Sequence, residues 1–359
     1  MHPSDKKEFF GSPEIINQVL GHGLENLPHA LLLCGPAGVG KALFATQLAA
    51  LLLCENRKGV QALELVACGS CPACHWLQTD NHPDFRRVAP GGEDAEGEAD
   101  EPGKALSADK TKKRATAIIK IAQIRELEDF VFVGSHRQGH RVILITHAES
   151  MNEPAANALL KILEEPPSGV YFLLISSKPR QLLATIRSRC RVVTFPRPDA
   201  TQSIQWLKEA GLGKSVERFL PLASGAPLRV LQWQADRQLD PMNDLIESLL
   251  SAPADPLVLA ERWNSMIKAD GVFSLELIVE GVQRWLFDLA QEAATDGGPV
   301  HYHQGWSRPR HAKSYSLPLL IQGWRDTLRF RRSARHPLNQ LLFLEDLAAH
   351  TLRALRPAS

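Results

Sequence analysis

The most constraining feature of the sequence is a glycine-rich turn between a short apolar run, residues 31–33, and a helical pattern that begins at Lys41. A glycine, four further residues and then Gly-Lys form the phosphate-loop motif. Its glycines let the backbone approach a phosphate closely, and free N–H groups at a helix N-terminus favour an anion there. The residues expected to hold phosphate groups are Gly35, Gly38, Gly40 and Lys41. This order of strand, loop and helix predicts a phosphate-loop domain of the α/β class.

Two places that normally serve Mg²⁺ and the attacking water lack the required side chains. A serine or threonine that binds Mg²⁺ normally follows the loop lysine, but Ala42 has no oxygen to offer. A second apolar strand, predicted at 142–145, should end in carboxylates that hold the metal and orient water, but Thr146 and His147 follow it. Glu149 lies further along, and we expect it to face away from the site. These losses argue against ATP hydrolysis, whereas weak binding of ATP or ADP and no binding at all both stay open.

Four cysteines follow the phosphate-loop helix. Three are separated by two residues each and the fourth lies upstream, so the expected metal ligands are Cys54, Cys68, Cys71 and Cys74. Four thiolates suit a tetrahedral zinc ion with no open coordination position, which is the pattern of a structural site. His75 is a rival ligand, and an iron–sulfur cluster is an alternative for the same thiolates. The simplest alternative without any metal is four buried free thiols. We predict one structural Zn²⁺.

Strand and helix patterns alternate up to residue 197, and only helical patterns follow. Apolar runs such as 142–145 and 170–175 are typical of buried strands, and the helices between strands predict a parallel sheet covered on both faces. Residues 90–113 are rich in glycine and charge and are predicted to form a mobile insertion. The expected domains are the phosphate-loop domain with its cysteine module (residues 1–197), a small helical domain (198–240) and a larger helical domain (241–359).

The composition of the whole chain excludes some classes of protein. A net charge of +1 over 359 residues gives no general attraction for nucleic acid. No apolar run approaches the ~18 residues of a membrane span, and the polar amino-terminal residues lack the apolar core of a signal peptide. We therefore expect a cytoplasmic protein with no membrane contact, in which thiols stay reduced and bind metal rather than form disulfides.

Several segments, taken in order, carry a family resemblance. They are residues 28–32, the loop at 35–41, the four-cysteine insertion, Ala155-Ala156-Asn157-Ala158-Leu159-Leu160-Lys161 with Leu163-Glu164-Glu165-Pro166-Pro167, and Ser188-Arg189-Cys190. In this combination the chain resembles the clamp-loader branch of the AAA+ ATPases. The resemblance is good over residues 10–196, weak at 224–229 and only architectural beyond.

The resemblance implies an AAA+ core with a zinc module, a small helical lid and an all-α collar domain that assembles a pentameric ring. The implied partners are the ATPase subunits and the delta subunit of the DNA polymerase III clamp loader. Through that complex the chain would act on the sliding clamp and primed DNA.

Within that family, ATPase members keep a serine or threonine after the loop lysine and an Asp-Glu pair on the second strand. The departures at Ala42, Thr146 and His147 therefore fit a member with no ATPase or polymerase activity of its own. Arg189 would serve as an arginine finger on a neighbouring subunit's ATP, and a plain surface arginine is the alternative. Arg229 corresponds only loosely to the family's lid arginine, so its role stays open.

Two other functions remain as alternatives. One is an ATP-hydrolysing clamp-loader subunit or a DNA-dependent ATPase switch, which the missing metal and water ligands oppose. The other is a zinc-containing DNA-binding protein, which the neutral net charge and the lack of a basic stripe near the cysteines oppose.

Overall fold

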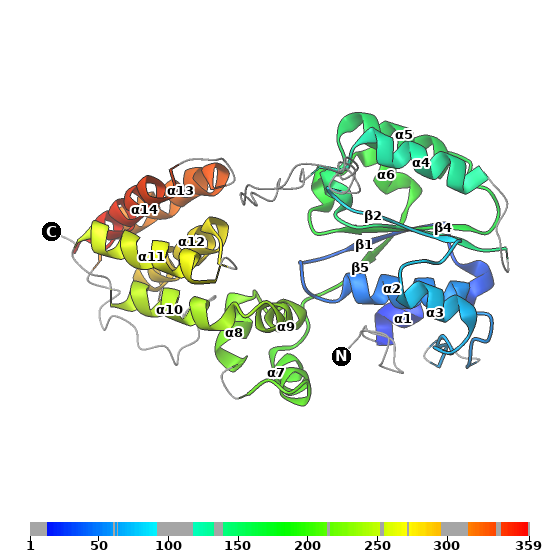
Figure 1. The fold of residues 1–359 in the computed structure, drawn as a ribbon, viewed down its shortest axis with the longest axis horizontal. Helices are drawn as coiled ribbons and strands as arrows, with labels where there is room; N and C mark the ends of the chain where they lie inside the picture. Colours follow the sequence, from blue (N-terminus) through cyan, green and yellow to red (C-terminus); the bar gives the residue numbers. More distant parts are fainter. Residues whose placement is uncertain are drawn as a thin grey trace, which may run out of the picture. The chain divides into compact units, whose positions relative to one another are not determined.

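The computed structural model describes residues 13–59, 62, 64–91, 118–132, 139–213, 216–251, 255–270, 273–295, 315–334 and 339–357. The chain divides into two compact units, residues 1–197 and 198–359 (Figure 1). Within the described ranges, no helix is both long enough and apolar enough to cross a membrane. The insertion predicted at 90–113 lies, apart from its first two residues, outside the described part of the chain.

A five-stranded parallel sheet forms the centre of the first unit. Its strands are β1 (Ala30–Cys34), β2 (Phe85–Val88), β3 (Arg141–Ile145), β4 (Val170–Ser176) and β5 (Arg191–Thr194). They lie in the order β2-β3-β4-β1-β5, with Leu31 of β1 aligned with Leu173 on one side and Arg191 on the other. Every residue of β1 and β3 is buried, because helices cover both faces of the sheet (Figure 1). The predicted parallel sheet flanked by helices is confirmed.

The covering helices divide between the two faces of the sheet. Their bounds are α1 (Pro13–Leu20), α2 (Lys41–Leu53), α3 (Pro72–Gln78), α4 (Ile121–Phe132), α5 (Glu153–Glu164) and α6 (Ala184–Arg189), with short 3-10 helices η2 (Leu24–Asn26), η3 (Ala148–Ser150) and η4 (Pro179–Gln181). Helices α4, α5 and α6 lie over one face, and α1, α2 and α3 lie over the other (Figure 1). Asn152 starts α5, since its Oδ1 accepts a hydrogen bond from the backbone N–H of Ala155 at 2.9 Å.

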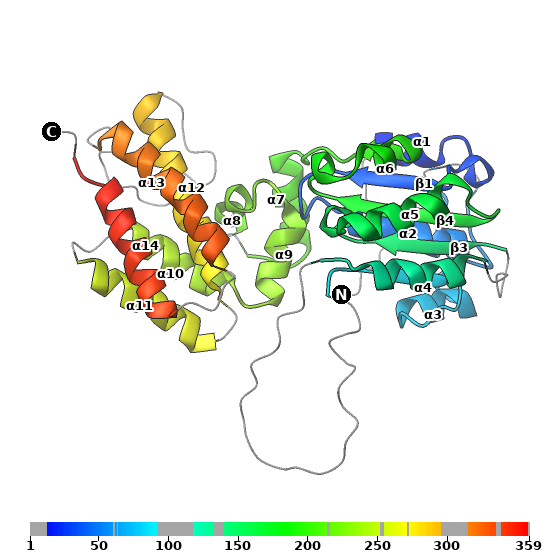
Figure 2. The same cartoon turned by 90° about the horizontal axis from the view of Figure 1, so that it is seen from above.

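The described residues of the second unit form helices and no strands. The helices are α7 (Ala200–Glu209), α8 (Val216–Leu222), α9 (Pro227–Ala235), α10 (Leu239–Leu250), α11 (Pro256–Asp270), α12 (Leu275–Ala294), α13 (Leu317–Ser333) and α14 (Gln340–Ala354). In both views α14 lies beside α11, and α13 lies beside α12 (Figure 2). Trp263 and Trp285 are buried in the core of this unit, and the indole N–H of Trp263 donates to Ser248 Oγ at 2.9 Å.

One apolar cluster runs through this second unit. It includes Leu207 of α7, Trp233 of α9 and Leu344 of α14, together with residues of the helices between them. The expected lid (198–240) and collar (241–359) thus contribute side chains to a common core, and their division at residue 240 stays a prediction.

Candidate functional site

The phosphate loop connects the C-terminal end of β1 to the N-terminus of α2. Gly35, Gly38 and Gly40 have φ values of 148°, 78° and 105°, which side chains disfavour. At Gly35 a Cβ would also lie 2.4 Å from the backbone oxygen of Phe195, which follows β5. Helix α2 then begins at Lys41, and the N–H of Phe44 bonds to the carbonyl oxygen of Gly40 at 2.9 Å. The sequence therefore forms the strand, loop and helix of a phosphate loop, as the motif predicts.

Lys41 folds its side chain back over this loop. Its Nζ donates to the carbonyl oxygens of Gly35 and Pro36 at 2.7 and 2.5 Å, and to Ser177 Oγ at 3.4 Å. Only 4% of the residue is exposed. Burial lowers the pKa of Lys41 to about 8, and the negative charge of Glu149 acts against that shift. The ammonium group is therefore held inside the loop, where it can bind an anion.

Glu149 lies beside this lysine, so the expectation that it faces away from the site is wrong. Its Oε1 accepts a hydrogen bond from the N–H of Ser177 at 3.1 Å, and Ser177 in turn contacts Lys41. The chain turns back after β3 because His147 adopts a left-handed conformation, with φ of 51°, and η3 follows at once. This turn carries a carboxylate to the C-terminal edge of β4, which strand periodicity alone does not predict.

The three positions expected to bind Mg²⁺ or orient water lack the required hydroxyl and carboxylate groups. Ala42 stands in the first turn of α2 and has no oxygen on its side chain. The Thr146 hydroxyl donates to the carbonyl oxygen of Val88 at 3.3 Å, so it is engaged with β2. His147 occupies the left-handed turn and caps no backbone group with its side chain.

The four predicted cysteines are brought together. Their sulfurs all lie within 4.8 Å of one another, with Cys54 to Cys71 and Cys68 to Cys74 both at 4.0 Å. Four sulfurs about 2.3 Å from a central zinc ion lie roughly 3.8 Å apart, so the spacing fits a tetrahedral metal ion. The rival ligand His75 is exposed and lies outside this group. The cluster combines the end of α2 with the start of α3.

The pKa values of three of these thiols are shifted in ways that bear on metal binding. Desolvation acts to raise the pKa of Cys68, but N–H groups of Ser70 and Cys71 donate to its sulfur and lower that pKa to about 6. Desolvation raises the pKa of the Cys54 and Cys74 thiols instead. Deprotonating Cys54 and Cys74 therefore requires a compensating positive charge, which a bound metal ion supplies.

Arg189 is the last residue of α6. Its Nη2 donates to Glu164 Oε1 at 2.6 Å, and its Nη1 donates to the carbonyl oxygen of Thr185 at 3.0 Å. The side chains of Arg189 and Glu164 are 35% and 51% exposed. Among the described residues, the hydrogen-bond partners of Arg189 belong to α5 and α6 and not to the phosphate loop. The neighbouring Cys190 is buried in the core.

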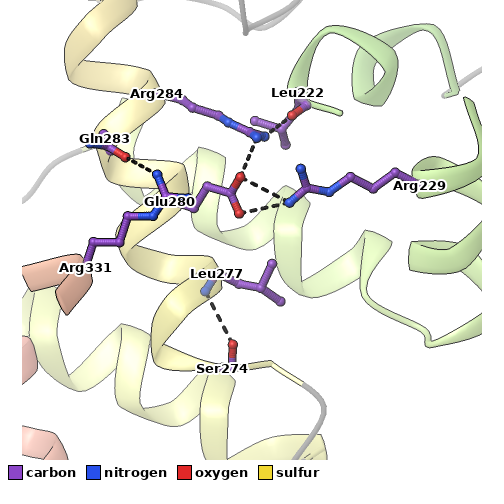
Figure 3. Close-up of polar contacts among 8 residues, drawn as sticks. All are labelled: Leu222, Arg229, Ser274, Leu277, Glu280, Gln283, Arg284 and Arg331. Carbon is purple, nitrogen blue, oxygen red and sulfur yellow. Dashed lines mark hydrogen bonds and ion pairs between the residues drawn. The ribbon is translucent and has the colours of Figure 1, made fainter. Parts of the chain in front are cut away.

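Arg229, whose role the sequence leaves open, is engaged within the second unit. Its Nη2 contacts both carboxylate oxygens of Glu280, at 2.9 and 3.1 Å (Figure 3). Its guanidinium lies 5.0 Å from the centre of the Trp233 ring. Arg284 donates to the same carboxylate and to the carbonyl oxygen of Leu222. This network joins α9 to α12.

The fold and the loop together define an α/β phosphate-loop protein. The family model described as DNA polymerase III, delta subunit, matches residues 15–199. The chain therefore belongs to this family of DNA polymerase III subunits, and the relatives that it matches are named subunit delta', the delta-prime subunit.

The chain is also similar to individual relatives and to a solved structure. DNA polymerase III subunit delta' of Pseudomonas aeruginosa is 36% identical over 244 residues, covering 66% of each chain. The Escherichia coli subunit delta' is 31% identical over 219 residues, covering 59% of this chain and 58% of its own length. The matches thus span less than two thirds of these relatives. A gamma subunit-related protein of Thermotoga maritima matches 91% of this chain and 96% of its own at 16% identity, with a TM-score of 0.43.

Proposed function

We propose that this chain is a non-hydrolysing subunit of a DNA polymerase III clamp loader. It joins the ATPase subunits and the delta subunit in a pentameric ring, with its AAA+ core, lid and collar, and the ring opens the sliding clamp and loads it onto primed DNA. Family membership supports the assignment to polymerase III. The observation that carries the non-hydrolysing role is a phosphate loop with no oxygen at Ala42 and no carboxylate at Thr146 or His147.

In this proposal Arg189 acts on the ATP of a neighbouring subunit. A guanidinium positioned at the γ-phosphate stabilises charge that spreads over its oxygens in the transition state. The present partner of Arg189 is an exposed carboxylate, and exposed pairs contribute only about 0–1 kcal/mol. Arg189 can therefore leave Glu164 for a phosphate at little cost.

The cysteine cluster is proposed to hold one structural zinc ion, with Cys54, Cys68, Cys71 and Cys74 as its ligands. The spacing of the sulfurs supports four-coordinate binding. All four positions are filled by protein thiolates, so the ion would stabilise the fold between α2 and α3 and leave no position for a substrate.

An ATP-hydrolysing subunit is the second candidate, and the observation that favours it is Glu149. This residue brings a carboxylate close to Lys41 even though the expected positions lack one. A carboxylate there could hold Mg²⁺ or orient water. The two candidates differ in what the purified chain does with ATP.

The purified chain is expected to show no ATP turnover above background. Restoring the hydroxyl with Ala42→Ser should not create activity, because Thr146 and His147 still supply no carboxylate. The measurement is phosphate release with Mg²⁺, with and without primed DNA, and with Lys41→Ala as the control for contaminating ATPases. Turnover by the wild-type chain that Lys41→Ala abolishes would establish the second candidate instead.

The purified chain is also expected to contain one zinc atom per molecule. Cys71→Ser should lose the metal, because three thiolates and a hydroxyl bind zinc less tightly than four thiolates. Cys190→Ser is the matched control, since this thiol is buried but lies outside the cluster. Elemental analysis measures the content, and a finding of iron, or of no metal in the folded wild-type chain, would contradict the proposal.

A further inference from the structure

Ser177 links the loop lysine to Glu149, a half-buried acid. Its hydroxyl oxygen lies 3.4 Å from Lys41 Nζ, and its backbone N–H donates to Glu149 Oε1 at 3.1 Å. Lys41 lies in α2, Ser177 directly follows β4 and Glu149 lies in η3, so the sheet topology brings the three residues together. One serine thus contacts both the ammonium group of Lys41 and the carboxylate of Glu149.

The second oxygen of this carboxylate has no such bond. Glu149 Oε2 is buried, and in the described part of the chain it accepts no hydrogen bond. A buried carboxylate is costly unless a nearby positive charge compensates it. Lys41 is the cation of the loop, and the charges of Lys41 and Glu149 act on each other.

We propose that Glu149 is an internal counter-ion of Lys41 and that it lowers the affinity of the phosphate loop for phosphate groups. A phosphate entering the loop must replace the contacts of Lys41 with the carbonyl oxygens of Gly35 and Pro36. It must also approach the Glu149 carboxylate, which carries a charge of the same sign and repels it. The inference rests on the proposed function, because a low affinity for nucleotide is what a subunit that hydrolyses nothing would need.

A different role for Glu149 makes the opposite prediction. If its carboxylate held Mg²⁺, removing the charge would weaken binding of the magnesium complex of a nucleotide. If it is a counter-ion, removing the charge strengthens binding of the nucleotide without metal. The sign of the change therefore separates the two roles.

The test measures ADP binding by calorimetry at pH 6.5, in buffer without added divalent cation and without a chelator that would remove metal from the cysteines. Glu149→Gln and Glu149→Met both remove the charge but differ in polarity, and each should tighten ADP binding about tenfold. Glu153→Gln is the matched control, because it removes an exposed charge at the start of α5 and should change little. Glu149→Asp keeps the charge and should stay within about twofold of wild type.

The pH dependence gives a second readout that a purely structural role would not move. Burial lowers the pKa of Lys41, and the charge of Glu149 partly offsets this by raising it. Cys34 also raises the pKa of Lys41. The charge of Arg187 acts on Cys34 in turn and lowers the pKa of that thiol. Without the charge of Glu149, Lys41 loses its proton at lower pH. The decline of ADP binding with rising pH should therefore begin at lower pH in Glu149→Gln than in wild type.

The outcomes separate this inference from the proposed function. Unchanged ADP affinity in both folded charge-removing variants, or weaker binding of Mg²⁺–ADP in them, overturns the counter-ion role whether or not the chain hydrolyses ATP. ATP turnover by the wild-type chain overturns the non-hydrolysing role, even where Glu149→Gln binds ADP more tightly. Circular dichroism and metal content establish that each variant is folded.

Discussion

Replacing Arg189 by alanine is expected to lower ATP hydrolysis at the neighbouring ATPase site by about 10³–10⁵-fold, the range found for arginine fingers supplied from another chain. The residue lies at the end of α6 with its guanidinium partly exposed. Lysine should restore little of the rate, because it lacks the planar fork that contacts two phosphate oxygens.

The experiment requires a ring in which only that neighbour can hydrolyse ATP. The other ATPase subunits therefore carry inactivated loop lysines, and single-turnover hydrolysis is measured with primed DNA and clamp present. Arg180→Ala is the matched control, since it removes an exposed arginine of the same unit. Glu164→Gln removes the present partner of Arg189 and should leave the rate unchanged or slightly raised.

Two results would contradict the role of Arg189. Normal hydrolysis by an assembled Arg189→Ala ring would make it an ordinary surface arginine. Loss of assembly in gel filtration, with normal hydrolysis per assembled ring, would make it a residue of the subunit interface only.

Local signals were sufficient to predict most elements of the first unit. Helix α2 begins at Lys41, because the glycines of the loop end the strand and allow the helix to start there. Asn152 and the two prolines after Glu165 bound α5 in the same way. The strand order could not be predicted from such patterns, since pairing such as β2 with β3 joins segments far apart in the chain.

The candidate sites also differ in whether a local sequence pattern predicts them. The cysteines share a short spacing and the loop is continuous, so both could be read from the sequence. Glu149 was missed because its position depends on a left-handed turn at His147, where the alternation of the preceding strand no longer applies. The pair of Arg229 and Glu280 is separated by 51 positions, and no local pattern connects the two residues.

Replacing Glu280 by alanine is expected to destabilise the second unit by about 3–5 kcal/mol, the usual cost of removing one partner from a buried ion pair. The Glu280 side chain is 22% exposed, and those of Arg229 and Arg284 are 25% and 13% exposed. The substitution removes the carboxylate that the Arg229 and Arg284 guanidinium groups share in this network. It also removes the link between α9 and α12, so the predicted lid and collar lose a direct connection.

Urea denaturation followed by tryptophan fluorescence measures this effect selectively. Six of the seven tryptophans lie in the second unit, and Trp76 is the exception. Glu261→Ala is the matched control, because Glu261 is an exposed glutamate of α11, and an exposed site should change stability by no more than about 0.5 kcal/mol. A Glu280→Ala chain as stable as this control would show that the network contributes nothing.

The pH dependence shows whether charge or packing is responsible. Desolvation acts to raise the pKa of Glu280, but Arg284 and Arg229 outweigh it and hold that pKa below its usual value. A carboxyl whose pKa is lower in the folded state adds stability above its unfolded pKa, and this stability is lost as the pH falls through the folded pKa. The difference between wild type and Glu280→Gln should therefore be largest near pH 7 and shrink in acid.

A triple replacement, Arg229→Met with Glu280→Leu and Arg284→Met, separates the cost of unpaired charge from the loss of contacts. Apolar side chains of similar size often replace a buried ionic network without loss of stability. Recovery of most of the stability lost in Glu280→Ala would show that uncompensated charge is the cause. A triple variant as unstable as Glu280→Ala would mean instead that the polar contacts with Leu222 and the ring of Trp233 stabilise this part of the fold.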